Sequence, residues 1–191
     1  MRGEPVHPEA LEAVRRMVNT SGYISSKPNP PGSERIAIDI GGADVNGSAR
    51  ALIPGVDRWY GLDIAEGEGV DLIADATDDT VMSAYHELFD VVLCTEVLEH
   101  VADWSSVVRN AWTVLSPDGF AFFTFAGTNG RTWARRPHGA RGEHDVPNGE
   151  HYANVPLHDF QAVVADTVVL VNHFEVMVRP NPGDIYCWFR K

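Results

Sequence analysis

The chain has 191 residues, 44% of them hydrophobic, which is enough for one domain with a sizeable core and too few for a second large one. Its 27 acidic and 15 basic residues give a net charge of −12, which opposes binding to a nucleic-acid phosphate backbone. Because no run of about 18 apolar residues and no N-terminal apolar signal core occur, we expect a cytoplasmic protein with no membrane partner.

The first 33 residues predict a helix followed by a linker. Leu11, Val14 and Val18 recur at helical spacing after Pro8, a residue suited to a first helical turn. The proline-rich stretch 21–33 cannot continue that helix. We therefore expect an amphipathic helix over residues 8–18 that packs on the rest of the domain.

From residue 35 onward, short apolar runs alternate with helical segments, which is typical of crossover units and a parallel sheet. The run 89–95 is apolar on both faces, as in a central parallel strand. The expected strands are 35–40, 58–63, 71–75, 89–95 and 120–125, and the expected helices are 48–52, 79–88 and 103–114, with a turn at 116–119.

The last third of the chain begins with an irregular stretch. Apolar periodicity stops between residues 126 and 155, and an insertion of this length in a compact domain is more often a functional loop than filler. Pro156 then opens a short helix to about Val164. The extended runs 167–179 and 184–190 predict an antiparallel pair that closes the chain.

Residues 36–47 form the pattern that organises the site. An apolar strand containing Asp39 is followed by Gly41 and Gly42, and such a strand and turn leading into a helix hold adenosine-containing cofactors at the carboxyl end of a parallel strand. Asp63 ends the next strand, 22 residues after Gly41, where its carboxylate can accept hydrogen bonds from two ribose hydroxyls.

The third strand ends in a further acid. Asp75, followed by the small residue Ala76, stands where an adenine edge would lie. For both Asp63 and Asp75 the alternative role is structural, since an aspartate at a strand end also starts turns and caps helices.

A dinucleotide is the competing cofactor. Its G-x-G-x-x-G pattern requires three glycines, whereas this chain has Gly41, Ala43 and Asn46 at those places. A positively charged sulfonium nucleoside needs no phosphate cradle and benefits from a carboxylate near the loop, such as Asp39 or Asp44. The acidic strand ends therefore favour the sulfonium nucleoside.

Several motifs together resemble the class I S-adenosylmethionine-dependent methyltransferases over about residues 34–190. They are D-I-G-G-A at 39–43, Asp63, Asp75, F-D-V-V-L-C-T-E-V-L-E-H at 89–100 and V-L-S-P-D-G at 114–119; D-V-N-G-S-A-R at 44–50 also resembles one branch of that superfamily. The resemblance implies an α/β fold, a doubly wound, mostly parallel seven-stranded sheet with an antiparallel last strand and helices on both faces.

The same resemblance implies S-adenosylmethionine as cofactor. The methionine side, the ribose, the adenine and the floor after the fourth strand would be bordered by Asp39, Gly41, Gly42, Ala43, Asp63, Ile64, Asp75, Ala76, Thr95 and Glu96. The chain departs from the family pattern at Ala43 and Val45, where glycines are usual.

Methyl transfer needs positioning above all, and a base only where the nucleophile starts protonated. His100, one helical turn past Glu96, is the first candidate base, and His151 in the insertion is the second. The alternative for His100 is a helix-end histidine satisfied by backbone.

The insertion also contains candidate substrate residues. His144 and Tyr152 would face the acceptor, and Trp133 with Arg135 could hold an anionic or sugar-phosphate group. A solvated surface loop is the alternative for all four. The histidines at 138, 144, 151 and 158 are six or seven residues apart, which matches no compact ligand motif, so we expect no metal.

The sequence therefore predicts one enzyme domain over residues 1–191. Its parts are the helix and linker 1–33, a cofactor-binding half 34–125, a substrate-facing insertion 126–155 and a closing helix and strand pair 156–191. We expect methyl transfer to a hydroxyl or amine of a small molecule, such as a sugar or a glycan. The alternatives are a non-catalytic binding module, suggested by Ala43 and Val45, and a nicotinamide-dependent oxidoreductase, disfavoured by the missing glycines.

Overall fold

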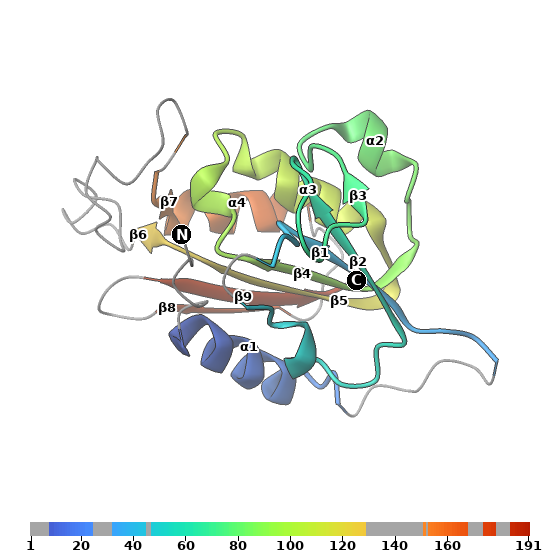
Figure 1. Cartoon of the computed structure of the whole chain (residues 1–191). Helices are drawn as coiled ribbons and strands as arrows, with labels where there is room; N and C mark the ends of the chain where they lie inside the picture. The colour runs from blue at the N-terminus through green and yellow to red at the C-terminus, as the bar shows by residue number, and fades with distance from the viewer. Residues whose placement is uncertain are drawn as a thin grey trace.

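The computed structural model describes residues 8–24, 32–44, 47–128, 151, 153–167, 174–178 and 184–191. One sheet runs through the middle of the molecule, with helices on either side (Figure 1). The elements in chain order are α1 (Pro8–Thr20), β1 (Ile36–Ile40), η1 (Arg50–Leu52), β2 (Arg58–Asp63), β3 (Leu72–Ile73), α2 (Asp79–Ser83), β4 (Phe89–Thr95), η2 (Leu98–His100), α3 (Trp104–Val114), β5 (Leu115–Phe125), β6 (Gly127–Thr128), β7 (Val155–Pro156), α4 (Leu157–Thr167), β8 (Phe174–Val178) and β9 (Ile185–Arg190).

The sheet has seven strands in the order β3-β2-β1-β4-β5-β9-β8. Strands β1 to β5 pair in parallel, and β9 is antiparallel to both β5 and β8. Six strands therefore run in one direction and the last strand of the chain runs in the other, as the resemblance implied. A separate parallel pair, β6 with β7, brings the two ends of the insertion together.

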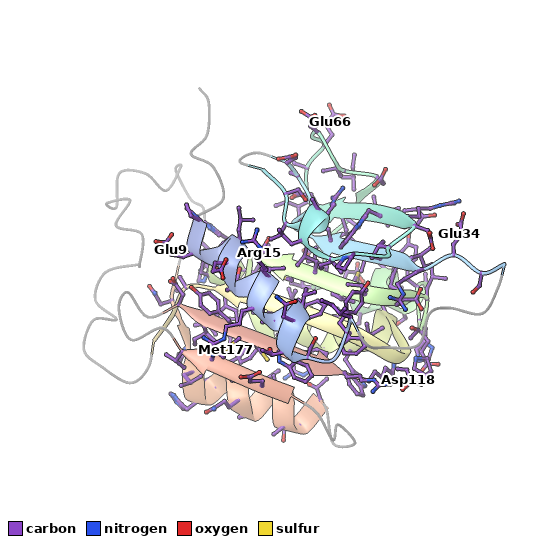
Figure 2. All side chains as sticks on the ribbon, turned by 90° about the horizontal axis from the view of Figure 1, so that it is seen from below. Glu9, Arg15, Glu34, Glu66, Asp118 and Met177 are labelled. Carbon is purple, nitrogen blue, oxygen red and sulfur yellow. The ribbon has the colours of Figure 1, made fainter. Side chains whose placement is uncertain are left out.

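Alternate side chains along each central strand enter two different cores. On one face, Val91 and Leu93 of β4 pack in a cluster with Met17 of α1. On the other face, Val92 and Cys94 pack in a cluster that includes buried residues of α3 and α4. Figure 2, viewed from the α1 side, shows that helix lying across the strands. The prediction of helices on both faces is confirmed.

The prediction of a helix after the glycine turn is wrong. Only the single 3-10 turn η1 forms there. Side chains bind the backbone amides that would enter a helix, because Asp44 Oδ1 accepts from Gly47 N (2.8 Å) and Ser48 Oγ accepts from Arg50 N (3.2 Å). Such local hydrogen bonds compete with helix formation.

The helix predicted over residues 79–88 is shorter than expected. Asp78 caps it by accepting from Thr80 N and Val81 N, but α2 ends at Ser83. Glu87 then adopts a left-handed conformation (φ 55°), and its amide donates to Thr113 O (3.0 Å). Leu88, the last residue of the predicted helix, lies outside α2 and is 46% exposed.

Two other segments differ from the prediction. The turn at 116–119 lies within β5, where the three residues from Phe89 to Val91 of β4 face the six from Leu115 to Phe120 of β5, so the chain bulges there. Helix α4 continues past Val164 to Thr167, so the predicted extended run 167–179 includes a helical residue at its start, whereas its described part at Phe174–Val178 forms β8. Residues 168–173 of that run lie outside the described residues.

Candidate functional site

The carboxyl ends of β3, β2, β1 and β4 lie side by side because these four strands are parallel neighbours. Ligands of doubly wound folds bind along this edge. Each predicted cofactor residue falls at one of these strand ends or in the turn that follows: Asp39, Gly41, Gly42, Ala43, Asp63, Ile64, Asp75, Ala76, Thr95 and Glu96.

The end of β2 presents a carboxylate with room for a ligand. Asp63 Oδ1 accepts from Ala65 N (3.2 Å), and no other hydrogen bond to this side chain is seen among the described residues. The next side chain, Ile64, is 76% exposed. An available acceptor therefore stands beside an apolar surface, which suits a ribose joined to a flat base.

The acid that follows β3 takes part in the local turn structure. Asp75 Oδ1 accepts from Thr77 N (2.8 Å) and from Thr77 Oγ1 (2.7 Å), which is the turn-forming role considered as the alternative. The buried Asn110 of α3 donates through Nδ2 to Ala76 O (3.0 Å). This contact fixes the backbone on which an adenine edge would rest.

The glycine turn after β1 uses its amides internally. Gly41 N and Gly42 N both donate to Leu62 O (2.8 and 3.0 Å), and Asp44 N donates to Glu68 O (2.7 Å). A phosphate cradle needs such amides free and aimed at the ligand. The turn therefore does not fit a pyrophosphate, which argues against the dinucleotide alternative.

Gly41 has no room for a side chain. It has φ 75°, and a Cβ there would collide with the Val97 side chain. Close packing of the turn against the segment after β4 therefore requires glycine at this position.

Asp39 lies on β1, just before the glycine turn, and forms an ion pair with Arg50. Its Oδ2 accepts from Arg50 Nε (2.8 Å), whereas its buried Oδ1 has no hydrogen-bond partner among the described residues. Burial raises the pKa of Asp39 to about 6, and the neighbouring Arg50 guanidinium limits that rise. The acid that the sequence assigned to the cofactor is thus held mainly by an arginine of the same chain.

Glu96 follows β4 in a strained backbone conformation (φ 56°). Its amide donates to Thr124 O (2.7 Å), and its Oε1 accepts from Thr124 Oγ1 (2.8 Å). Non-glycine residues keep such conformations only where their surroundings enforce them, and they cluster at functional sites.

Glu99 is a buried acid that joins three segments. Its Oε1 accepts from Ala126 N (3.2 Å), and its backbone carbonyl accepts from Ala153 N (2.8 Å). Burial, aided by the nearby Glu96 carboxylate, raises the pKa of Glu99 to about 8. The loop after β4 is thereby tied to both ends of the insertion.

The two candidate bases lie near these contacts between Glu99 and the insertion. His100, which follows Glu99, ends η2, and its side chain is exposed, as is that of His151. Because Ala153 bonds the Glu99 carbonyl and two residues span at most about 7 Å, His151 is confined to the same region.

Several predicted positions lie outside the described residues. They are Val45 of the glycine turn and the substrate candidates Trp133, Arg135, His144 and Tyr152. Within the described part of the chain, no group of three or more histidines, cysteines and acids could hold a metal ion. No described helix is long and apolar enough to cross a membrane.

Four site residues were missed by sequence reasoning. Asn110 carried a signal, since it is a polar residue within the apolar stripe of the helix predicted over 103–114. Glu99 lies in the quoted E-V-L-E-H motif, but no role was assigned to it there. Nothing in the sequence assigned Arg50 or Thr124 a role, because an arginine in a short predicted helix and a threonine in a predicted strand are ordinary there. Their roles emerge only from tertiary contacts.

We predict that replacing Glu99 by glutamine changes how stability depends on pH. The pKa of Glu99 is about 8 in the folded chain, above its ordinary value of 4.5, so the folded state retains the proton more tightly. The stability that this provides is complete below about pH 4.5 and is lost as pH rises towards 8, by at most about 1.4 kcal/mol per pH unit. Glutamine cannot ionise, so E99Q should gain on the wild type as pH rises.

Urea unfolding of both proteins at pH 5 and pH 8 measures this difference, with the exposed Glu12→Gln as control. A difference between E99Q and wild type that is the same at both pH values would show that Glu99 has an ordinary pKa.

Comparison with known proteins agrees with this geometry. Residues 32–167 match the family described as the methyltransferase domain. A ubiquinone biosynthesis O-methyltransferase from Pectobacterium atrosepticum is 35% identical over 114 residues, which cover 55% of this chain and 46% of that protein. The chain thus spans about half the length of the curated relatives it matches.

Solved structures share the fold at low identity. A SAM-dependent methyltransferase from Archaeoglobus fulgidus superposes with a TM-score of 0.60 at 12% identity, covering 95% of this chain and 94% of that one. The 1,6-didemethyltoxoflavin-N1-methyltransferase of Burkholderia thailandensis, solved with S-adenosylhomocysteine, gives 0.58 at 14% identity, covering 94% and 78%. Together with the family match, these likenesses show that the chain belongs to the class I S-adenosylmethionine-dependent methyltransferases.

Proposed function

We propose that the protein transfers a methyl group from S-adenosylmethionine to a hydroxyl group of a small molecule. The observation that carries this proposal is the end of β2, where one carboxylate oxygen of Asp63 has no hydrogen bond among the described residues and lies beside the exposed Ile64. Family membership supports the cofactor, and the O-methyltransferase relatives support an oxygen as the attacking atom.

The chemistry of the edge fits a cationic nucleoside. Asp39, Asp44 and Asp63 lie at or beside the turn, and the described turn amides at Gly41 and Gly42 are already used by Leu62 O. An anionic pyrophosphate would meet carboxylates and find no free donors at these amides, whereas a sulfonium and an ammonium would be attracted. This contrast favours S-adenosylmethionine over a nicotinamide dinucleotide.

The predicted roles follow the order of the strands. Asp63 would accept from the ribose hydroxyls, Ile64 and Ala76 would border the adenine, and Thr95 with Glu96 would form the floor near the methyl group. Asp39 and the glycine turn would shape the methionine side. The positions of these residues at or just after the carboxyl ends of neighbouring parallel strands support the assignments.

The acceptor would be a small molecule with a free hydroxyl, such as a phenol, a sugar or a glycan. Because the chain spans about half of the relatives it matches, their substrates are a guide to the attacking atom and not to the whole acceptor. The excess of acidic residues favours an uncharged or cationic acceptor over nucleic acid.

The chain itself has two tasks in this reaction. It must hold acceptor oxygen and methyl carbon in line, and it must accept the hydroxyl proton as the new carbon–oxygen bond forms. When bound, S-adenosylmethionine would supply the methyl group, and its sulfonium sulfur would take the electrons of the broken bond and become the thioether of S-adenosylhomocysteine. His100 and His151 are the proposed proton acceptors, since histidine exchanges protons near neutral pH.

A non-catalytic binding module would keep the fold without the chemistry. The strained backbone of Glu96, enforced by two contacts with Thr124, favours the enzyme, because a scaffold has no need to maintain such strain beside the ligand.

We predict that Asp63→Ala weakens binding of S-adenosylhomocysteine, the demethylated product, by about 10- to 150-fold. The ribose would lose a charged hydrogen-bond acceptor worth roughly 1.5 to 3 kcal/mol. Isothermal titration calorimetry measures this change directly.

The control is Glu12→Ala, since Glu12 is an exposed acid on α1 and its loss removes the same charge outside the strand-end edge. Equal affinities of D63A and wild type would reject the ribose assignment. Equal losses of affinity in D63A and E12A would show a general effect of charge and no ribose contact.

We also predict that removing the proton acceptor lowers turnover and leaves cofactor binding unchanged. His100→Ala or His151→Ala should lower kcat on a hydroxyl acceptor by about 100-fold or more while S-adenosylhomocysteine affinity stays near normal. Single-turnover assays of both variants test this, and normal turnover removes that histidine from candidacy.

A further inference from the structure

Arg50 holds together three segments around the cofactor edge. Its Nε donates to Asp39 Oδ2 on β1 (2.8 Å), and its Nη2 donates both to Gly42 O in the glycine turn and to Gly69 O in the β2–β3 loop (3.0 Å each). The guanidinium also lies 5.9 Å from the centre of the Trp59 ring on β2. Only 18% of the arginine side chain is exposed.

Glycines make this approach possible. A Cβ at Gly42 would come within 2.7 Å of Arg50 Nη2, and one at Gly61 would meet both Nη2 and Gly69 O. Gly69 itself has φ 83°, a conformation that favours glycine. The guanidinium therefore occupies a slot that any larger residue at these positions would fill.

The hydrogen bonds of Arg50 anchor the glycine turn where a helix was expected to do so. In the expected strand-turn-helix unit, the helix that follows the turn would anchor it, but here only η1 forms. Arg50, the first residue of η1, instead fastens the turn to the β2–β3 loop, and Asp44 N reinforces the link by donating to Glu68 O (2.7 Å). The two loops that flank Asp63 are thus joined on the α1 side of the sheet.

We propose that Arg50 is a positioning residue that holds the glycine turn and the β2–β3 loop in the shape that binds the cofactor. This rests on the proposed function for its consequence, because those loops border the site of the ribose and the methionine moiety. Arg50 acts through the loops: its donors face Asp39 and two backbone carbonyls of the same chain.

The planar fork of arginine is essential to this role. Its Nε and Nη2 point in different directions from one rigid plane, so one side chain reaches a carboxylate and two carbonyls together. A lysine would keep the charge beside Asp39 but offers a single nitrogen. Arg50→Lys should therefore preserve the ion pair and lose the loop tie.

The test compares Arg50→Lys with Arg58→Lys. Arg58 is an exposed arginine at the start of β2 that pairs with Glu34. We expect R50K to bind S-adenosylhomocysteine about tenfold or more weakly in calorimetry, the effect of losing one charged hydrogen bond, and R58K to bind like the wild type. Hydrogen exchange should quicken together at residues 41–44 and 67–71 in R50K while α1 keeps its protection.

Each outcome decides between the claims. Unchanged exchange in both loops, or unchanged affinity in R50K when the wild type binds, overturns the role of Arg50 and leaves the proposed function standing. Failure of the wild type to bind S-adenosylhomocysteine contradicts the proposed function, and the exchange data then decide alone whether Arg50 ties the loops.

A second variant tests the same proposal if R50K does not fold. Arg50→Met combined with Asp39→Asn removes both charges, so no unpaired charge is left buried. It should fold, show the same paired quickening of exchange and bind weakly, and wild-type exchange in this variant overturns the proposal.

Discussion

The parallel pairing of β1 with both β2 and β4 is the constraint on which the site depends. Its register places Asp39 opposite Gly61 on one side and Leu93 on the other, so the strand ends come level along one edge. Backbone pairing thereby gathers acids that are far apart in sequence. The side chains of this edge could not meet in an antiparallel arrangement, where successive strands end on opposite sides.

Two buried acids at this edge are neutralised in different ways. Arg50 balances the charge of Asp39, whereas Glu99 retains its proton near neutral pH because burial and Glu96 disfavour its charge. The half-buried Asp63 has one carboxylate oxygen with no hydrogen bond among the described residues. The chain thus limits the cost of its acid-rich edge where water is excluded.

Sequence reasoning was most successful where one local pattern determines structure. The apolar run of β4 and the boundaries of β2 follow directly from side-chain alternation and strand-end residues. The helix after the turn failed because Asp44 and Ser48 bind nearby amides, a competition that periodicity does not register. Arg50 and Thr124 were missed because their partners are distant in sequence, and no single-sequence pattern reports such contacts.

The central claim is that this acidic edge holds a sulfonium nucleoside, with Asp63 on the ribose. A crystal structure of the protein with S-adenosylhomocysteine tests it most directly. The account predicts ribose hydroxyls within hydrogen-bonding distance of the Asp63 carboxylate, adenine between Ile64 and Ala76, and Arg50 still bound to Gly42 O and Gly69 O. A ligand whose ribose lies away from Asp63, or which displaces Arg50 from both carbonyls, would contradict it.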